Sequence, residues 1–351
     1  DTGPSDSDDI TSDTTPTLSG TGGDNGDTVT LYADGAPVGT ATVQPDGSYS
    51  ITPNAPLAEG TPALTVTFTD PSGNESAPSA ALSVTIDTTV PTAPAAPDLE
   101  DASDTGTSNT DDLTGDTTPT LVGTDGTAGD TVKLYADGTE VGMATVEPDG
   151  TYSVTPDAPL AEGTPALTVT FTDPSGNESA PSAALPITID ATAPTTPATP
   201  TLDPASDTGT PGDGITSDTT PTLTGTGTPG ETVKLYADGT EVGMATVEPD
   251  GTYSITPDAP LAEGTPDLTV TFTDPSGNES TPSTALPVTI DATAPTTPAT
   301  PTLDPASDSG TLGDNITSDT TPTLTGTGTP GETVKLYADG TEVGMATVEP
   351  D

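Results

Sequence analysis

The stretch Thr232–Ile255, TVKLYADGTEVGMATVEPDGTYSI, decides the fold of this sequence. It begins with the run Thr232–Ala237, in which Val233 and Leu235 fall on one face, and period-two alternation rich in Thr and Val is typical of half-buried strands. Asp-Gly pairs at positions 238–239 and 250–251 separate this run from those that follow, and Asp-Gly between such runs favours a tight hairpin turn. The stretch therefore predicts consecutive antiparallel β-strands.

Further runs of this kind follow and precede it. Leu268–Phe272 and Leu286–Ile290 alternate in the same way, and apolar residues near Thr199–Leu202 and Thr219–Leu223 add shorter strands. Gly, Pro and Thr interrupt every helical pattern, so no helix of useful length is expected. About seven short antiparallel strands in roughly 100 residues predict an all-β, Ig-like β-sandwich.

The sequence is one such unit repeated. The motif LYADG begins at Leu31, Leu134, Leu235 and Leu336, with spacings of 103, 101 and 101 residues. Solenoid and propeller repeats are shorter, about 20–50 residues, so this period fits tandem sandwiches. We predict repeats at 1–89, 90–192, 193–293 and 294–351, joined end to end by short Pro-rich linkers.

The two end repeats are expected to be incomplete. Asp1-Thr2-Gly3 aligns with Asp207-Thr208-Gly209, so the first repeat lacks its leading linker. The fourth stops before the segments that correspond to its last three strands. We therefore expect residues 315–351 to be unstable unless they dock on another surface.

The composition excludes several classes of protein. The 351 residues carry 55 Asp+Glu against 3 Lys+Arg, a formal net charge of −52. Nucleic acids and anionic membranes are recognised through Lys and Arg, so neither is an expected partner, and no apolar run is long enough for direct membrane insertion. The absence of Cys and His removes disulfides, thiolate chemistry and the usual zinc ligands.

The acidic residues gather where repeats should meet. In an up-and-down trace, the loop of residues 273–283 lies at the same pole as the N-terminal segment of its repeat, and the last strand ends at the opposite pole. The aspartates that open one repeat are therefore expected to surround the aspartate that ends the preceding repeat, together with Asp274 and Asn278.

Five or six carboxylates at one pole repel each other, and a hard cation with oxygen ligands relieves that repulsion. Magnesium tends to keep its waters and zinc prefers His or Cys, so Ca²⁺ is the best candidate. The candidate ligands are Asp87, Asp101, Asp104, Asp111, Asp116 and Asp173 at the first junction, Asp190, Asp203, Asp207, Asp213, Asp218 and Asp274 at the second, and Asp291, Asp304, Asp308, Asp314 and Asp319 at the third.

Two other interpretations of these carboxylates exist. Acidic loops can simply keep a protein soluble, but their recurrence at the poles, with few aspartates facing inward along the strands, favours calcium. Paired carboxylates can also catalyse glycoside hydrolysis. The chain has no Trp, and its few Tyr and Phe fall mostly at expected core positions, so no aromatic sugar platform and no enzyme is expected.

The motifs VTIDATAP, ITSDTTPTLTGT, PGETVKLYADG and FTDPSGNES resemble the bacterial Ig-like repeats of giant surface adhesins of the biofilm-associated and RTX types, over essentially all 351 residues. The resemblance implies an extracellular extender region between a membrane-anchoring end and ligand-binding domains, with calcium at the domain junctions. It points to the acidic residues already named. The second repeat has Asp111-Asp112 where the third has Asp213-Gly214, which leaves open whether Asp111 or Asp112 is the ligand.

Together these observations predict a non-catalytic, monomeric spacer at the bacterial cell surface. Its partners would be calcium ions, which stiffen it, and the neighbouring repeats, and it would support cell adhesion and biofilm formation. An alternative is that the repeats themselves bind glycans or proteins, with avidity from near-identical copies. A third interpretation, a disordered acidic spacer, is disfavoured by the periodic apolar residues.

Overall fold

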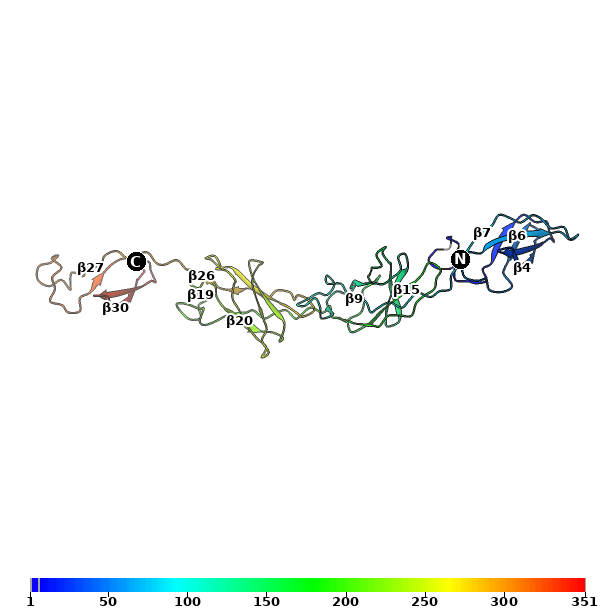
Figure 1. Ribbon diagram of the computed structural model, residues 1–351. Coiled ribbons are helices and arrows are strands. Elements are labelled where there is room, and N and C mark those ends of the chain that lie inside the picture. Colours follow the sequence, from blue (N-terminus) through cyan, green and yellow to red (C-terminus); the bar gives the residue numbers. More distant parts are fainter. Residues whose placement is uncertain (1, 6, 351) are drawn as a thin grey trace. The chain divides into compact units, whose positions relative to one another are not determined.

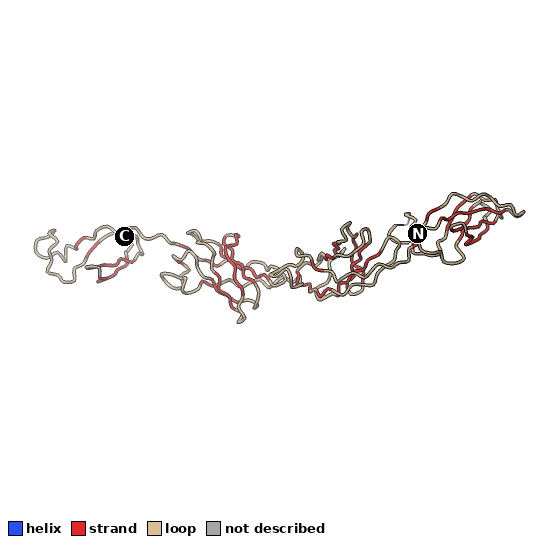
Figure 2. Tube along the Cα trace, in the orientation of Figure 1, coloured by secondary structure: helices blue, strands red, loops and turns tan. Residues whose placement is uncertain are grey.

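The structure is a computed structural model that describes residues 2–5 and 7–350 (Figure 1). The described residues form strands, turns and loops, and no helix occurs among them (Figure 2). Two compact units, Asp1–Ile290 and Asp291–Asp351, make up the chain and are described separately. The expected all-β fold of tandem Ig-like sandwiches is confirmed, with three sandwiches in the first unit.

One sheet of the third repeat has three antiparallel strands, in the order β18 (Thr201–Leu202), β20 (Leu223–Thr226) and β23 (Thr252–Ile255). Leu223 lies opposite Ile255 on one side and opposite β18 on the other, so aliphatic side chains share one face of this sheet. The short strand β18 confirms that the end of the Pro-rich linker is the first strand of its repeat.

The second sheet has four strands, in the order β22 (Thr240–Thr246), β21 (Thr232–Ala237), β24 (Asp267–Thr273) and β25 (Leu286–Pro287). The two-residue turn Asp238-Gly239 joins β21 to β22, and its residues have φ angles of 49° and 78°. Positive φ at both positions is what a type I′ turn requires, and that turn matches the twist of the hairpin strands. The hairpin predicted at Asp238-Gly239 is confirmed, whereas the one predicted at Asp250-Gly251 is wrong, because the turn there carries the chain from β22 to β23 in the other sheet.

A parallel pair completes the sandwich. β19 (Ile215–Thr216) pairs in parallel with β26 (Thr289–Ile290), whereas the sequence led us to expect antiparallel strands only. The run Leu286–Ile290, expected as one last strand, is therefore divided: its first part pairs with β24 and its end pairs with β19.

The same elements recur along the chain. The first repeat contains β1 (Ile10–Thr11), β2 (Leu18–Thr21), β3 (Thr28–Ala33), β4 (Ala36–Thr42), β5 (Ser48–Ile51), β6 (Ala63–Thr69), β7 (Leu82–Ser83) and β8 (Thr85–Ile86). The second contains β9 (Asp98–Leu99), β10 (Leu113–Thr114), β11 (Leu121–Gly123), β12 (Thr131–Ala136), β13 (Thr139–Thr145), β14 (Tyr152–Val154), β15 (Ala166–Thr172), β16 (Leu185–Pro186) and β17 (Thr188–Ile189).

Each sandwich of the first unit has a core of its own. In the third repeat Val233, Leu235 and Val270 are 0 % exposed, because alternate residues of β21 and β24 face the opposing sheet. The ring of Tyr253 packs edge-on against Phe272 at a centroid distance of 5.9 Å. These contacts confirm the inward-facing residues expected from the alternating pattern.

Alkaline titration is expected to show the burial of Tyr152 in the second repeat. Burial raises its pKa to about 12, compared with about 10 in an unfolded chain. The folded state therefore holds this proton more tightly, so the group's contribution to stability is complete below about pH 10 and is lost as the pH rises through about 12. We expect tyrosinate absorbance from this residue to appear late, and Tyr152→Phe to weaken the alkaline loss of stability. An equally steep loss in the variant would contradict this assignment.

The second unit has fewer partners for its strands. It contains β27 (Thr302–Leu303), paired with β28 (Leu324–Thr325), and β29 (Thr333–Ala338), paired with β30 (Thr341–Thr347). Val334 is 46 % exposed, whereas the equivalent Val233 of the third repeat is fully buried. The expected instability of residues 315–351 stays a prediction, and this exposure is its structural basis.

Candidate functional site

The end of the second repeat contacts a loop of the third. We call residues 173–177 and 274–278, both with the sequence Asp-Pro-Ser-Gly-Asn, the tip loops of the second and third repeats. The Nδ2 of Asn278 donates to the backbone oxygen of Asp190 at 2.7 Å and to Asp274 Oδ2 at 2.9 Å. One amide thus joins the residue that follows β17 to the tip loop of the next repeat.

The same tip loop docks on a second segment of the preceding repeat. We call residues 100–112, 203–214 and 304–315, which lead from β9, β18 and β27 towards the next strand or strand position, the acidic loops. The backbone oxygen of Ser276 accepts hydrogen bonds from Thr105 Oγ1 at 2.7 Å and from Gly115 N at 3.0 Å. The backbone oxygen of Pro275 accepts one from Thr107 N at 3.3 Å. We call this contact between an acidic loop and a tip loop the joint.

The first and second repeats form an equivalent joint. The Nδ2 of Asn177 donates to the backbone oxygen of Asp87 at 2.8 Å. The backbone oxygen of Ser175 accepts from Thr2 Oγ1 at 2.6 Å and from Ser12 N at 3.1 Å. The expectation that the end of one repeat meets the N-terminal pole of the next is therefore confirmed at these two junctions.

The structure corrects the expected grouping of the acidic residues. Loop 203–214 was expected to surround Asp190, but it leads into β19, which pairs with the last strand of its own repeat and so places the loop at the C-terminal pole. The acidic loop beside Asp190 is that of the second repeat, because Asp190 N donates to Thr114 O, directly after loop 100–112. The physical reason is that the chain runs along the sandwich through β18, from the N-terminal pole to the C-terminal pole, before the acidic loop begins. Asp101, Asp104, Asp111 and Asp116 thus lie at the pole of Asp190, while Asp203, Asp207, Asp213 and Asp218 lie at the far pole of the third repeat.

Most of the predicted ligands already accept hydrogen bonds from nearby backbone amides. This holds for Asp87, Asp111, Asp116, Asp173, Asp190, Asp203, Asp207, Asp213, Asp218, Asp274, Asp291, Asp304, Asp308, Asp314 and Asp319. Among residues 2–5 and 7–350, no three or more acidic side chains form a group that could hold a metal ion by themselves. The predicted carboxylates therefore do not form a complete metal site by themselves, and their ligand roles stay predictions.

One equivalent set of aspartates differs from the rest: Asp104, Asp207 and Asp308. In each, the Oδ1 atom is buried and has no hydrogen-bond partner. Asp104 is only 6 % exposed and Asp308 only 8 %. An unpaired carboxylate oxygen is costly to bury unless a cation or a proton neutralises it. These three atoms are the candidate cation ligands with the best structural support.

The surroundings of Asp104 are themselves negative. Burial raises the pKa of this carboxyl, and the charges of Asp111 and Asp112 act in the same direction. A cation placed at Oδ1 would relieve both effects, because it compensates the desolvated charge and screens the two neighbours. The residues present therefore fit a hard cation, provided that backbone, hydroxyl or water oxygens complete its shell.

The structure also distinguishes Asp111 from Asp112. Asp111 aligns with Asp213, and the side chains of both accept the amide two residues further on, at 3.3 and 2.9 Å. Asp112 aligns with Gly214, and both have positive φ, 57° and 70°. Asp112 therefore occupies a turn position that favours glycine, and Asp111 is the equivalent of the predicted ligand.

Sequence reasoning did not identify several residues of these poles. Asp130 is 3 % exposed, and its pKa is raised by burial and by the charge of Asp173. Gly106 allows the tip loop to approach closely, because a side chain at this position would collide with it: a Cβ would lie 2.0 Å from Pro275 O. A signal for Asp130 was present, since an acidic residue precedes the Thr-Val pair of each LYADG strand. None existed for Gly106, because the close approach comes from another repeat.

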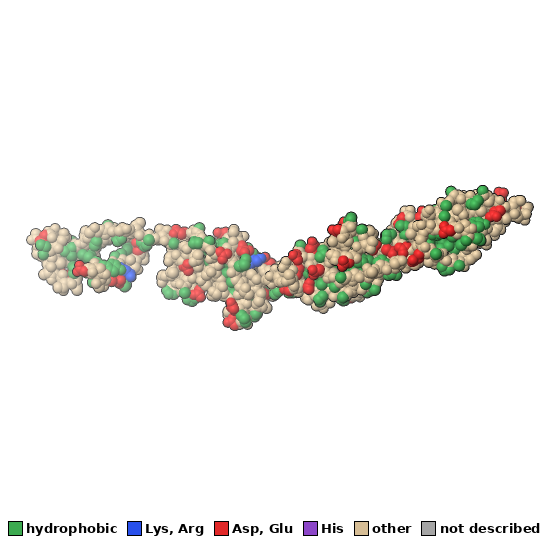
Figure 3. Space-filling model, in the orientation of Figure 1, with side chains coloured by type: hydrophobic (Ala, Val, Ile, Leu, Met, Phe, Trp, Pro, Cys, Tyr) green, Lys and Arg blue, Asp and Glu red, His purple; other side chains and the backbone are tan. Residues whose placement is uncertain are grey.

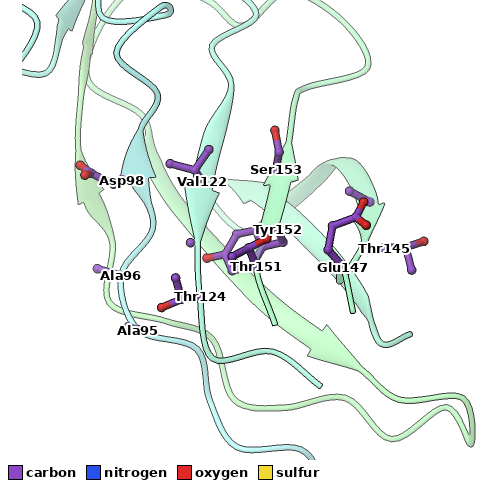
Figure 4. A pocket seen from close by; sticks show the side chains of 12 residues that line it. Ala95, Ala96, Asp98, Val122, Thr124, Thr145, Glu147, Thr151, Tyr152 and Ser153 are labelled. Atoms are coloured by element: carbon purple, nitrogen blue, oxygen red, sulfur yellow. The ribbon is translucent and has the colours of Figure 1, made fainter. Parts of the chain in front are cut away.

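The surface also carries shallow grooves. In the second repeat a groove of about 710 Å³ lies along β9, β11 and β14, and Figure 4 shows Asp98, Tyr152 and Glu147 among its lining residues. Figure 3 shows acidic side chains along the visible face and lysine only at isolated points. The groove thus combines small polar and apolar side chains with two carboxylates, and its lining holds no basic residue.

The described part of the chain has no helix long and apolar enough to cross a membrane. A family model described as bacterial Ig-like domain matches four consecutive segments, residues 1–88, 89–191, 193–292 and 294–351. No curated protein sequence shows significant similarity to the chain.

Several solved structures resemble the chain. One is a Ca²⁺-stabilised adhesin with which an Antarctic bacterium reaches out and binds ice (25% identity, TM-score 0.34, 98% of this chain and 86% of that chain). Another comes from a 1.5-MDa bacterial ice-binding adhesin (22% identity, TM-score 0.28, 82% and 96%), and a third is the BSP domain of a biofilm-associated protein (21% identity, TM-score 0.21, 76% and 57%). At these TM-scores the superpositions carry no argument about function, and the family match makes the assignment.

Proposed function

Because the chain belongs to the bacterial Ig-like domain family, whose model matches it in four consecutive segments, we propose that it is a non-catalytic spacer of a bacterial cell-surface adhesin. The spacer works outside the cell and holds a distal ligand-binding region away from its anchor. Calcium bound at the acidic loops stiffens it, and in this way it supports adhesion and biofilm formation.

The observation that carries this proposal is the joint. A tandem array serves as a spacer only if neighbouring repeats hold a defined orientation, and flexible linkers alone do not provide one. Here the tip loop of the third repeat is held by three hydrogen bonds from Thr105, Thr107 and Gly115, and its own Asn278 amide donates a further one to Asp190 O. Direct contacts of this kind restrict the motion of one repeat against the next.

The Pro-rich linker supports the same conclusion. Thr196 contacts Thr281 through its hydroxyl group, and Thr199 contacts Thr284 in the same way, so the linker is bound along its own repeat. Pro197 and Pro200 are buried. Proline also limits the backbone conformations available between these contacts. The linker therefore behaves as part of the sandwich.

Calcium, when bound, supplies the positive charge that the acidic loops lack. Asp104, Asp207 and Asp308 would hold it through their unpaired Oδ1 atoms, with Asp111, Asp213 and Asp314 as neighbouring carboxylates of the same loops. Extracellular modules bind calcium with Kd values of about 0.1–1 mM. A single site at ten times Kd stabilises the folded state by about 1.4 kcal/mol, and several sites per chain add to this.

Removal of calcium is the experiment that tests the proposal. We expect a calcium-specific chelator to lower the melting temperature by about 4–8 °C for each kcal/mol lost from a repeat. Solution scattering should show a more flexible particle, because loosened acidic loops hold their tip loops less well. Magnesium at the same concentration is the control and should not restore either property. Unchanged melting and scattering after chelation would exclude calcium as the stiffening ion.

The alternative, repeats that are themselves adhesive, has the groove along β9, β11 and β14 in its favour. A similar groove of about 570 Å³, lined by Tyr49 and Gln44 among others, occurs in the first repeat. Glycan-array binding by the intact chain, lost on Glu147→Lys together with Gln44→Lys, would support the alternative. Absence of binding would leave the spacer as the function.

A further inference from the structure

The unpaired carboxylate oxygens are a property of single acidic loops. In Asp207 and Asp308 the Oδ2 atom accepts a backbone amide of the same loop, Gly212 N at 2.5 Å and Gly313 N at 2.6 Å. The Oδ1 atom of each points away from that bond and remains buried without a partner. One oxygen therefore holds the loop together, and the other is left for a ligand.

Each acidic loop is also closed by bonds within its own repeat. Thr216 Oγ1 donates to Ser206 O at 2.5 Å, and Ser206 Oγ donates to Asp218 Oδ2 at 2.8 Å. In the second unit, Thr317 Oγ1 makes the equivalent bond to Ser307 O at 2.5 Å. None of these bonds around the carboxylate involves a tip loop.

Asp308 distinguishes between two possible arrangements, an ion held by a single acidic loop and an ion that bridges two repeats. Loop 304–315 belongs to the fourth repeat, and no tip loop follows it within the 351 residues. Its Asp308 Oδ1 is nevertheless buried and unpaired, as is that of Asp104, whose loop holds the tip loop of the third repeat. If the ion bridged two repeats, a buried and unpaired Oδ1 atom would be expected only where two repeats meet. Its presence at Asp308 therefore favours an ion held by one loop.

We propose that each acidic loop holds one divalent cation by itself, ligated by Asp104, Asp207 or Asp308, and that the next repeat docks on the loop that the ion has ordered. This inference rests on the proposed function and concerns how the ion acts. Thr105 and Gly106, which directly follow Asp104, are among the residues that contact the tip loop. The ion and the neighbouring repeat therefore stabilise the same short segment.

Two ligands that stabilise one segment must favour each other's binding, and the coupling is reciprocal. The loop at Asp104 is therefore expected to bind calcium more tightly than the loop at Asp308, by about fivefold or more if the coupling is typical. Conversely, loss of the ion loosens the joint without breaking any bond between the two repeats directly.

Calcium counting on the whole chain tests this arrangement. Equilibrium dialysis with radioactive calcium is performed on the 351-residue chain and on Asp104→Asn, Asp207→Asn, Asp308→Asn and the triple variant. We expect each single variant to lose one ion and the triple variant to lose three. Asp149→Asn, which changes the charge equally at an exposed turn, is the control and should lose none. Circular dichroism spectra that match the parent confirm that the variants fold.

The variant Asn278→Ala, which alters the contact between the repeats and leaves the acidic loop unchanged, tests the coupling. It removes the amide that ties the tip loop to Asp190, so the ion count should stay the same while the affinity at Asp104 falls. An unchanged ion count in Asp308→Asn, combined with the loss of one ion in Asp104→Asn, would overturn the proposal and show that the ion bridges repeats. A parent chain that binds no calcium would instead refute the proposed calcium-dependent function, so the two failures are distinguishable.

Discussion

Replacing Leu235 with alanine is expected to destabilise the third repeat by about 2–5 kcal/mol. Leu235 is fully buried between β21 and the opposing sheet, and its loss leaves a cavity that a sandwich of about 100 residues cannot easily collapse. Small domains have only about 5–15 kcal/mol of stability, so this single change removes a large fraction of it.

The fourth repeat supplies a matched control for this prediction. Leu336 occupies the same place in an identical stretch, TVKLYADG, but is only partly buried because β29 pairs with β30 alone. Leu336→Ala is therefore expected to change local stability much less. Hydrogen-exchange mass spectrometry measures both, since the substitution changes the mass of its peptide and distinguishes it from the identical repeats. Equal losses of protection in the two variants would show that burial does not determine the effect.

Gly106→Ala is expected to open the joint between the second and third repeats. Gly106 has a φ of 113°, where a side chain is strained by about 1–3 kcal/mol, and the new Cβ would lie 2.0 Å from Pro275 O. A contact that short cannot persist, so the tip loop must withdraw. It would then lose hydrogen bonds with Thr105 and Thr107 that are worth about 0.5–1.5 kcal/mol each.

Gly209→Ala separates strain from docking. Gly209 occupies the same position of the next acidic loop and has a φ of 85°, but a Cβ there would meet no atom within 4 Å. The chain has no cysteine, so cysteines introduced at the exposed Thr139 and Thr240 can carry spin labels, one in each of two neighbouring repeats. We expect a broader distance distribution in Gly106→Ala and an unchanged one in Gly209→Ala. Equal broadening in both variants would assign the effect to backbone strain.

The large strands of the sandwich could be predicted from the sequence because their signals are local. In β21 and β24 apolar and polar residues alternate over six or seven positions, and the turn between β21 and β22 has the sequence Asp-Gly, which is typical of hairpins. β18 and β19 are only two residues long, too short for alternation to appear. The parallel pairing of β19 with β26 joins segments far apart in the sequence, and no local pattern indicates it.

This missed pairing explains the error at the candidate site. The sequence correctly identified acidic loops, the tip loop and the meeting of Asp190 with Asp274 and Asn278. It could not show which pole each acidic loop occupies, since that depends on β19. Nor could it single out Asp104 from its acidic neighbours, because burial and the absence of a hydrogen-bond partner are properties of the folded loop.

The parallel pair β19–β26 also determines how a repeat responds to stretching. Once β18 has separated from β20, a pull on the two ends of the repeat draws β19 and β26 in opposite directions along their length. The hydrogen bonds between the two strands, such as that from Thr289 N to Gly214 O at 2.8 Å, are perpendicular to the pulling force and bear it at the same time. An antiparallel hairpin pulled from its open end would instead unzip one bond at a time. Survival under load then depends on the unfolding rate, so a repeat with this pairing can resist stretching even where its sandwich is only marginally stable.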